Sequence, residues 1–276
     1  MSGEPPTPAQ WDAATGQYDA YLDTPGGKLR NALTWHHLSP HLPPIDPNDP
    51  PLILDAGCGP GRTTARLATL GYRVQAIDPA PAMLTVARER IAALPPEVAA
   101  RVEIAQGDLA AIPSFVAPAS CAAIICHNVL EFVPDPAEAI RTLAGVLQPG
   151  GIISILTLNR WSEVLRAAVT NHDATAVLAA LGQRTIFEQM TGGQRRMNDA
   201  DEIVGWLKAE DIDVIGLHGI RVLSDYLPGG ELRAAVGGRV GGRGPGWGGI
   251  RAPGAAGGDH REESMSRRSP CGSCPV

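Results

Sequence analysis

The spacing of a glycine-rich turn and three carboxylates in this chain suggests a ligand-binding site. The turn reads DAGCGPG at residues 55–61 and directly follows the apolar run PLIL. Asp78 ends a second apolar run, and Asp108 comes shortly after a third. An apolar run that leads into glycines is typical of a buried strand followed by a nucleotide-binding turn. We therefore expect these residues to face one ligand at the carboxyl ends of neighbouring strands.

The turn differs from a dinucleotide-binding turn, which reads G-x-G-x-x-G and faces a pyrophosphate. Here the glycines follow the pattern G-x-G-x-G, and Asp55 lies directly before them. A carboxylate is unfavourable beside a pyrophosphate but suits a cationic group, such as the ammonium of S-adenosylmethionine (SAM). Asp78 is placed to bind a ribose, and Asp108 to bind an adenine amino group. The alternatives are an NAD site, or a turn that serves only to reverse the chain.

Strand-like and helix-like runs alternate along the middle of the chain. The expected strands are 52–55, 73–78, 102–105, 121–127, 151–158 and, later, 214–218. The expected helices are 9–23, 27–42, 62–70, 81–93, 136–147 and 199–209. Strands that alternate with helices predict a parallel, doubly wound sheet, and runs that are apolar throughout are typical of strands buried on both faces.

Composition divides the chain into three parts. Residues 1–45 carry the two N-terminal helices, which we expect to cover the SAM site. Residues 46–227 form the sheet domain, with a lid-like insertion near residues 160–198. Residues 228–276 are rich in Gly, Arg and Pro and poor in apolar side chains. We expect this tail to be disordered, because it cannot bury enough surface to offset its ordering entropy.

The turn and the three carboxylates resemble those of class I SAM-dependent methyltransferases, and LQPGG at residues 147–151 is similar to their LxPGG turn. Three further stretches are similar to the tRNA 5-carboxymethoxyuridine methyltransferase family. They are GGKLRNALTW at 26–35, CHNVLEFVPDP at 126–136 and GIRVLSDYL at 219–227. The resemblance covers residues from about 10 to 227. That family methylates the carboxylate of a modified wobble uridine in tRNA anticodons.

The resemblance implies a role for each residue at a matching position. Arg30 would hold the methionine carboxylate of SAM, because a guanidinium binds a carboxylate through two parallel hydrogen bonds. His127 would lie beside SAM on the substrate side, and Arg221 and Tyr226 would position the substrate, with Arg221 as the anchor of its carboxylate. The predicted cofactor-binding residues are Arg30, Asp55, Gly57, Cys58, Gly59, Asp78, Pro79, Met83, Asp108, Leu109 and His127. No metal ligand is expected.

Each of these assignments has a structural alternative. Arg30 could be an exposed helix arginine, His127 a packed histidine, and Arg221 the partner of Asp225. Cys58 is expected to matter through its small size and its backbone. Methyl transfer from SAM is an in-line displacement that mainly requires alignment. A carboxylate acceptor needs no general base, whereas an amine or phenol often does, and His127 is the candidate for that base.

The resemblance ends after residue 227. Family members continue with a seventh strand at the sheet edge, whereas this chain continues with the Gly/Arg-rich tail. The predicted fold is therefore α/β, a doubly wound, mostly parallel, Rossmann-like methyltransferase sheet whose terminal strand is missing or disrupted. The predicted function is SAM-dependent methylation of the wobble-uridine carboxylate. The alternatives are a small-molecule O- or N-methyltransferase, or a SAM-binding protein inactivated by its altered C-terminus.

Charge and composition limit the partners and the compartment. The net charge of −6 argues against a generally basic nucleic-acid binder. An anticodon loop needs only a local basic rim. Candidates for that rim are Lys28, Arg30, Arg184, Arg195 and Arg196. We expect no membrane contact and a cytoplasmic setting, since the sequence has no apolar run near 18 residues, no signal-peptide pattern and only scattered cysteines.

Overall fold

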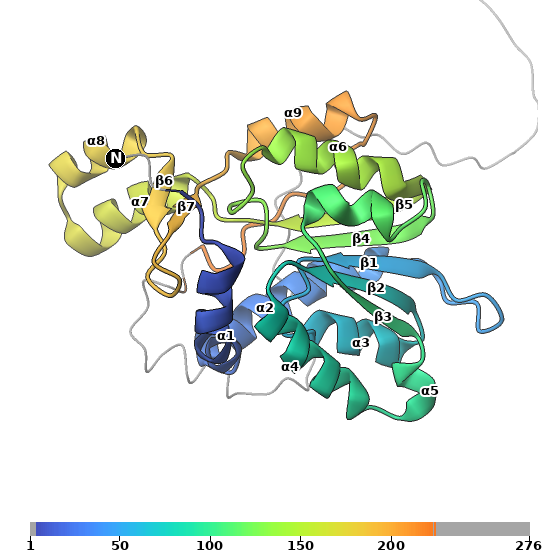
Figure 1. The fold of residues 1–276 in the computed structure, drawn as a ribbon. Helices are drawn as coiled ribbons and strands as arrows, with labels where there is room; N and C mark the ends of the chain where they lie inside the picture. The colour runs from blue at the N-terminus through green and yellow to red at the C-terminus, as the bar shows by residue number, and fades with distance from the viewer. Residues whose placement is uncertain (1–3, 223, 225–276) are drawn as a thin grey trace, which may run out of the picture. The chain divides into compact units, whose positions relative to one another are not determined.

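Five parallel strands form the central sheet of the computed structural model, which describes residues 4–222 and 224 (Figure 1). The strands are β1 (Leu52–Ala56), β2 (Arg73–Asp78), β3 (Val102–Gln106), β4 (Cys121–His127) and β5 (Leu147–Leu156). They lie in the order β3-β2-β1-β4-β5. The strand order reverses between β1 and β4, and open α/β sheets bind ligands at the carboxyl ends of strands at such a point. The predicted fold class is confirmed.

Helices cover both faces of this sheet (Figure 1). α3 (Arg62–Leu70) and α4 (Pro81–Ala92) lie on one face, and α6 (Pro136–Val146) and α9 (Ala200–Ala209) lie on the other. Ile53 packs in one cluster with Leu67 of α3, whereas its neighbour Leu54 packs in another with Ile140 of α6. Successive strand residues point to opposite faces. Two covered faces therefore explain why the strands are apolar throughout.

The remaining elements frame the two ends of the domain. They are α1 (Pro8–Leu22), α2 (Pro25–Leu38), the 3₁₀ helices Ser39–His41 and Leu109–Ser114, α5 (Pro96–Ala99), α7 (Trp161–Arg166), the π-helical turn Ala167–Asn171, α8 (Ala174–Leu181), β6 (Thr185–Phe187) and β7 (Gln194–Arg196). The two N-terminal helices begin where local capping dictates. Thr7 forms a capping box with Gln10, and Thr24 accepts a hydrogen bond from the Gly27 N–H.

The insertion near residues 160–198 folds as two short helices followed by the antiparallel hairpin β6–β7. A buried ion pair holds the hairpin to the segment after β4, because Arg195 Nη2 lies 2.8 Å from Glu131 Oε1. The N–H of Arg196 also donates to the Glu131 carbonyl at 2.9 Å. This part of the chain is therefore attached to the carboxyl end of the sheet.

The prediction of a sixth strand at 214–218 is wrong, because these residues form no strand in the structure. The side chains of Ile215 and Leu217 are 66% and 72% exposed. A run of Val, Ile and Leu indicates strand propensity, but a strand forms only when its backbone pairs with a neighbour. Among the described residues β5 is an edge strand, and a cavity of about 1100 Å³ lies between it and residues 212–222. The tail at 228–276 lies outside the described residues.

Two glycines offer a test of the packing around the turn. Gly61 has a φ of 74°, and a Cβ atom there would lie 2.9 Å from the Cβ of Ala87 in α4. We expect Gly61→Ala to lower the free energy of unfolding by about 1–3 kcal/mol through backbone strain and overlap. Gly145, near the end of α6, has nothing within 4 Å of a built Cβ. Gly145→Ala should raise the free energy of unfolding by about 0.5–1 kcal/mol. Urea denaturation measures both, and a neutral Gly61→Ala would contradict the close helix contact.

Candidate functional site

The glycine turn after β1 uses its backbone N–H groups inside the protein. The N–H groups of Gly57 and Cys58 donate to the Ile77 carbonyl at 2.8 and 3.0 Å. The N–H of Gly59 donates to Asp78 Oδ2 at 2.8 Å. The N–H of Gly61 donates to the Cys58 carbonyl at 3.1 Å. The remaining residue, Pro60, has no N–H. A phosphate-binding turn instead points free N–H groups at its ligand. This turn therefore suits a cationic ligand group better than a pyrophosphate.

Asp55 is a buried carboxyl group at the end of β1. It is 4% exposed, and its Oδ2 accepts a hydrogen bond from the Thr64 hydroxyl at 2.6 Å. Burial raises the pKa of Asp55 to about 6, the hydrogen bond from Thr64 opposes that rise, and the nearby Asp78 adds to it. No cationic side chain of the described residues contributes to this pKa. A cationic ligand would therefore stabilise the ionised form of Asp55.

Asp78 is the last residue of β2 and Asp108 follows β3, and the N–H of Gly107 links the two strand ends by donating to the Asp78 carbonyl at 3.1 Å. The Asp78 oxygens accept from the N–H groups of Gly59 and Ala80 at 2.8 and 2.9 Å, and burial raises the pKa of Asp78. A carboxylate oxygen accepts more than one hydrogen bond. Asp78 therefore keeps capacity for ribose hydroxyls.

Other predicted cofactor residues also have structural roles. Asp108 is exposed, and its Oδ1 caps the following 3₁₀ helix by accepting from the Ala111 N–H at 3.0 Å. Met83 and Leu109 are buried, at 3% and 6% exposed. Pro79 is partly buried and lies between β2 and α4. Contact between these residues and a ligand stays a prediction.

The thiol of Cys58 has no direct chemical role in this site. The side chain is 8% exposed and packs with Leu84. Burial raises the pKa of the thiol, and the neighbouring Asp55 and Asp78 raise it further. The group therefore stays protonated at neutral pH and is a poor nucleophile.

A pocket of about 170 Å³ lies between the turn and the N-terminal helices. Its walls include Arg30 and Thr34 of α2, Tyr18 of α1, Asp55 and His127. The backbone of Gly57 also lines it. This pocket brings the residues of GGKLR and the glycine turn together, although they are separated by some thirty positions in the sequence.

Arg30 is not an ordinary exposed helix arginine. Its Nε is buried without a hydrogen-bond partner among the described residues, and its guanidinium lies 5.1 Å from the centre of the Tyr21 ring. A buried unpaired donor is unfavourable, so this group indicates a ligand acceptor in the pocket. Arg30 and Asp55 thus give one pocket a cationic and an anionic side chain.

His127 ends β4 and lines the same pocket. Its Nε2 lies 2.9 Å from the Ser154 hydroxyl of β5. Burial lowers the pKa of His127 to about 4, and the positive charge of Arg30 contributes to the shift. The imidazole is therefore neutral at pH 7 and is a weak general base.

Arg221 lies against the start of α2. Its Nη1 donates to the Tyr21 hydroxyl at 2.6 Å, and a Cβ atom at Gly26 would lie 3.3 Å from its Nη2. Because Tyr21 also faces Arg30, the structure brings the start of GIRVLSDYL beside GGKLR. Tyr226 and Asp225 lie outside the described residues.

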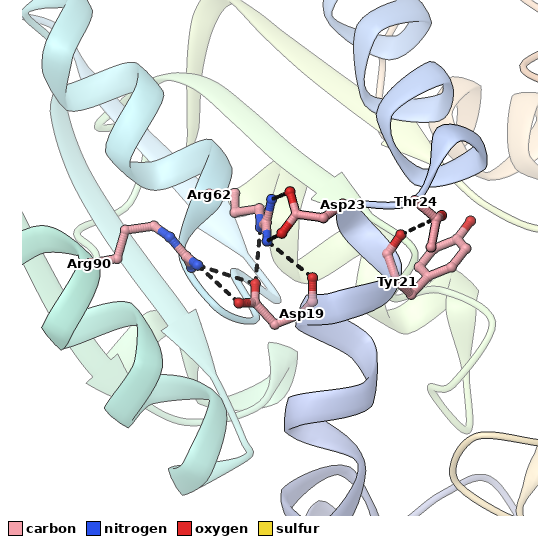
Figure 2. Close-up of polar contacts among 6 residues, drawn as sticks. All are labelled: Asp19, Tyr21, Asp23, Thr24, Arg62 and Arg90. Carbon is pink, nitrogen blue, oxygen red and sulfur yellow. Dashed lines mark hydrogen bonds and ion pairs between the residues drawn. The ribbon is translucent and has the colours of Figure 1, made fainter. Parts of the chain in front are cut away.

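An ion cluster that the sequence reasoning missed holds α1 over the turn (Figure 2). Arg62, the first residue of α3, contacts Asp19 at 3.0 Å and Asp23 at 2.7 Å. Arg90 of α4 contacts Asp19 at 3.2 Å. The i, i+4 spacing of Asp19 and Asp23 puts both on one helix face, which was the available signal. Nothing in the sequence indicated which arginines they would meet.

An aromatic group lies beside the end of β4, although aromatic residues make up only 4% of the chain. Trp11 meets Phe132 edge-on, with ring centres 5.1 Å apart, and meets Tyr18 at 5.8 Å. All three are partly exposed. This arrangement, also missed in the sequence, places an aromatic wall of edge-to-face rings beside the pocket, which Tyr18 lines.

The expected basic rim is mostly neutralised by acids. Arg195 contacts Glu131 and Glu188, and Arg184 and Arg196 both contact Glu202, at 3.2 and 3.8 Å. Arg30 faces the pocket. A rim of paired charges presents a weak positive field to an RNA backbone.

Within residues 4–222 and 224, no helix combines the length and apolar character needed to cross a bilayer. The same residues contain no group of three or more His, Cys, Asp or Glu side chains arranged to hold a metal ion.

The pKa of Asp55 predicts a pH-dependent stability. The folded pKa of about 6 exceeds the usual aspartate pKa of 3.8, so the folded state keeps a proton that the unfolded state loses. Stability therefore falls as the pH rises from about 4 to 6 and stays reduced above that, by up to about 3 kcal/mol. We expect Asp55→Asn to be more stable than the wild type at pH 7.5 and equal to it near pH 4. Urea denaturation across this range is the measurement.

The matched control is Asp49→Asn, at an exposed carboxylate in the loop before β1. It should change stability by less than about 0.5 kcal/mol at either pH. If Asp55→Asn is less stable than the wild type at pH 7.5, the carboxyl group is not destabilised by burial.

Comparisons with known proteins show which proteins this chain is similar to. Residues 54–155 match the family model described as "Methyltransferase domain". A "Ubiquinone biosynthesis O-methyltransferase" of Xanthomonas campestris pv. campestris (strain B100) is 33% identical over 171 residues, which are 61% of this chain and 65% of that protein. Its counterpart in Xanthomonas euvesicatoria pv. vesicatoria (strain 85-10) is 38% identical over 130 residues, 47% of this chain and 52% of that protein. The chain thus spans less than two thirds of the length of these relatives.

Solved structures share the fold. A S-adenosylmethionine-dependent methyltransferase from Mesorhizobium loti aligns with a TM-score of 0.52 at 22% identity, over 66% of this chain and 82% of that one. Geranyl diphosphate C-methyltransferase from Streptomyces coelicolor A3(2) also aligns with a TM-score of 0.52, at 16% identity. The alignment covers 76% of this chain and 70% of that one. The relatives named here are not from the tRNA 5-carboxymethoxyuridine family, so that finer resemblance stays a proposal. Residues 54–155 thus match a methyltransferase domain, and the chain shares the fold of these S-adenosylmethionine-dependent methyltransferases.

Proposed function

We propose that this protein transfers the methyl group of SAM to an oxygen atom of a small acceptor. The observation that carries the proposal is the placement of Arg30 and Asp55 on the walls of one pocket. The amino-acid end of SAM carries a carboxylate and an ammonium. A pocket with an unpaired guanidinium nitrogen on one wall and a buried carboxyl on another matches both charges.

The backbone of the turn supports the same orientation. The N–H groups of Gly57 and Cys58 are occupied by the Ile77 carbonyl, so these two residues offer a ligand no free backbone donor, whereas their carbonyl oxygens can still accept. Carbonyl oxygens accept hydrogen bonds from an ammonium group. Asp78 would then bind the ribose and Asp108 the adenine, since both follow strands further along the same sheet edge.

The acceptor side favours a flat, small molecule. The aromatic wall of Trp11, Tyr18 and Phe132 lies beside the pocket, and aromatic side chains bind planar rings by stacking or edge contacts. The relatives named as ubiquinone biosynthesis O-methyltransferases are consistent with a small acceptor oxygen. The polar residues near the wall, Arg195 and Glu131, are bonded to each other.

The chemistry requires alignment more than acid–base catalysis. Bound SAM supplies a methyl carbon that its sulfonium already activates. With a pKa of about 4, His127 is a weak base, so the site suits an acceptor that is anionic without help. A carboxylate or an acidic phenol meets that condition. The residues around the pocket hold the reactants in line and exclude water.

The second candidate function is methylation of the tRNA wobble-uridine carboxylate in the cytoplasm. One observation favours it: Arg221 lies against Tyr21 and Gly26, so two stretches that resemble the tRNA family meet in space. An arginine at that position is suited to a substrate carboxylate. The paired charges of Arg184 and Arg196 count against a large RNA contact.

Methyl transfer from labelled SAM separates these functions. The acceptors would be a panel of phenols and aromatic acids, and tRNA that carries 5-carboxymethoxyuridine. Transfer to the small acceptors supports the leading proposal, whereas alkali-labile label on tRNA supports the second. Calorimetric binding of SAM without transfer to any acceptor would instead indicate a SAM-binding protein inactivated by its C-terminus.

Removal of the Arg30 side chain tests the cofactor assignment. We expect Arg30→Ala to weaken SAM binding by roughly 10- to 100-fold, since hydrogen bonds to charged groups contribute about 1.5–3 kcal/mol. Its melting temperature should stay near that of the wild type, because the side chain makes no ion pair within the described residues. Unchanged SAM affinity in a calorimetric titration would refute the role of Arg30.

Arg221→Ala tests the substrate side. We expect SAM affinity to be preserved, since Arg221 does not line the 170 Å³ pocket, and methyl transfer to be strongly reduced. Tyr21→Phe is the matched control, because it removes the hydroxyl that Arg221 contacts and keeps the ring beside Arg30. A loss of SAM affinity with normal turnover per bound SAM would contradict a substrate role for Arg221.

A further inference from the structure

Thr34 presents an unpartnered hydroxyl to the same pocket. It lies four residues after Arg30 in α2, so both side chains are on one face of the helix. Its Oγ1 is buried and has no hydrogen-bond partner among the described residues. Arg30 and Thr34 both line the pocket beneath the glycine turn.

A free hydroxyl is unusual for a helical threonine, because this side chain readily donates to the carbonyl four residues before it. Other threonines of this protein make that bond. They are Thr15, Thr69, Thr85 and Thr142, with distances of 3.0, 2.8, 3.1 and 3.1 Å. Thr34 does not donate to Arg30 in this way. Its donor is therefore available to a ligand in the pocket.

We propose that Thr34 is a second anchor for the carboxylate at the amino-acid end of the cofactor. Its hydroxyl donates to one carboxylate oxygen while Arg30 donates to the other. This inference rests on the proposed SAM-dependent function and adds a positioning residue to it. Thr34 would hold the methionine chain, and through it the sulfonium, in line with the acceptor.

The charges of the pocket decide which end of the amino acid Thr34 meets. Asp55 and the carbonyl oxygens of the turn are acceptors, and they suit the ammonium. Arg30 is cationic and suits the carboxylate. Thr34 lies one helical turn from Arg30, on the cationic wall. Its hydroxyl therefore donates to the carboxylate.

The proposal predicts a ligand-specific effect. S-adenosylhomocysteine carries the amino-acid end, whereas 5′-methylthioadenosine lacks it and keeps the adenine and ribose. We expect Thr34→Val, which retains the shape and removes the hydroxyl, to weaken S-adenosylhomocysteine binding by about 10-fold. Affinity for 5′-methylthioadenosine should be unchanged. Thr34→Ser, which keeps the hydroxyl, should stay within about threefold of the wild type for both ligands.

Calorimetric titration of the full chain measures all three proteins, and their melting temperatures are recorded beside it. Thr34→Val should melt no lower than the wild type, because it removes a buried unsatisfied donor. In Arg30→Ala, the added Thr34→Val change should have a smaller effect than in the wild type, since two groups on one carboxylate are coupled.

Three results would overturn the proposal. Equal losses for both ligands would show a packing role, and an unchanged affinity for S-adenosylhomocysteine would show no role for Thr34. In either case wild-type binding leaves the proposed function intact. A wild type that binds neither ligand would overturn the proposed function together with this inference.

Discussion

The parallel pairing of β1 with β2 controls the polarity of the binding site. It places the Ile77 carbonyl under the turn, where it accepts the N–H groups of Gly57 and Cys58. Asp78, the next residue, accepts the N–H of Gly59. With its donors satisfied, the turn has only acceptors left for a ligand. A turn with the same glycines and free N–H groups would bind phosphate instead.

This constraint makes the opposite wall of the pocket important. In the proposed SAM site, the donors and the cation for the amino-acid end come from α2, whose Arg30 and Thr34 line the pocket. α2 is attached to α1, and the Asp19–Arg62–Arg90 cluster ties α1 to α3 and α4 (Figure 2). The cluster is only partly exposed, so its charges are less screened than those of a surface pair. The N-terminal helices therefore supply the pocket wall that lies opposite the glycine turn.

The burial of Asp55 links stability with binding. Its carboxyl group has a raised pKa because burial desolvates it and Asp78 lies nearby. Such a group destabilises the protein without ligand, and a bound cationic ligand offsets this destabilisation. The pKa of His127 shifts in the opposite direction, since burial lowers it and keeps the imidazole neutral beside Arg30. Both shifts follow from the same desolvated crevice at the strand ends.

Apolar periodicity and glycine spacing are local signals, and they predicted the five strands of the central sheet, the helices that cover it and the place of the turn. The sequence by itself also indicated Arg30, Asp55 and His127 through motifs. Only the tertiary structure decided that Arg30 and Asp55 share a pocket, that Arg221 meets Tyr21, and that residues 214–218 form no strand. Thr34 and the Asp19 cluster were not visible in the sequence. Their roles depend on which distant groups they face or fail to face, and such contacts between α2, α3 and the turn arise only when the chain packs.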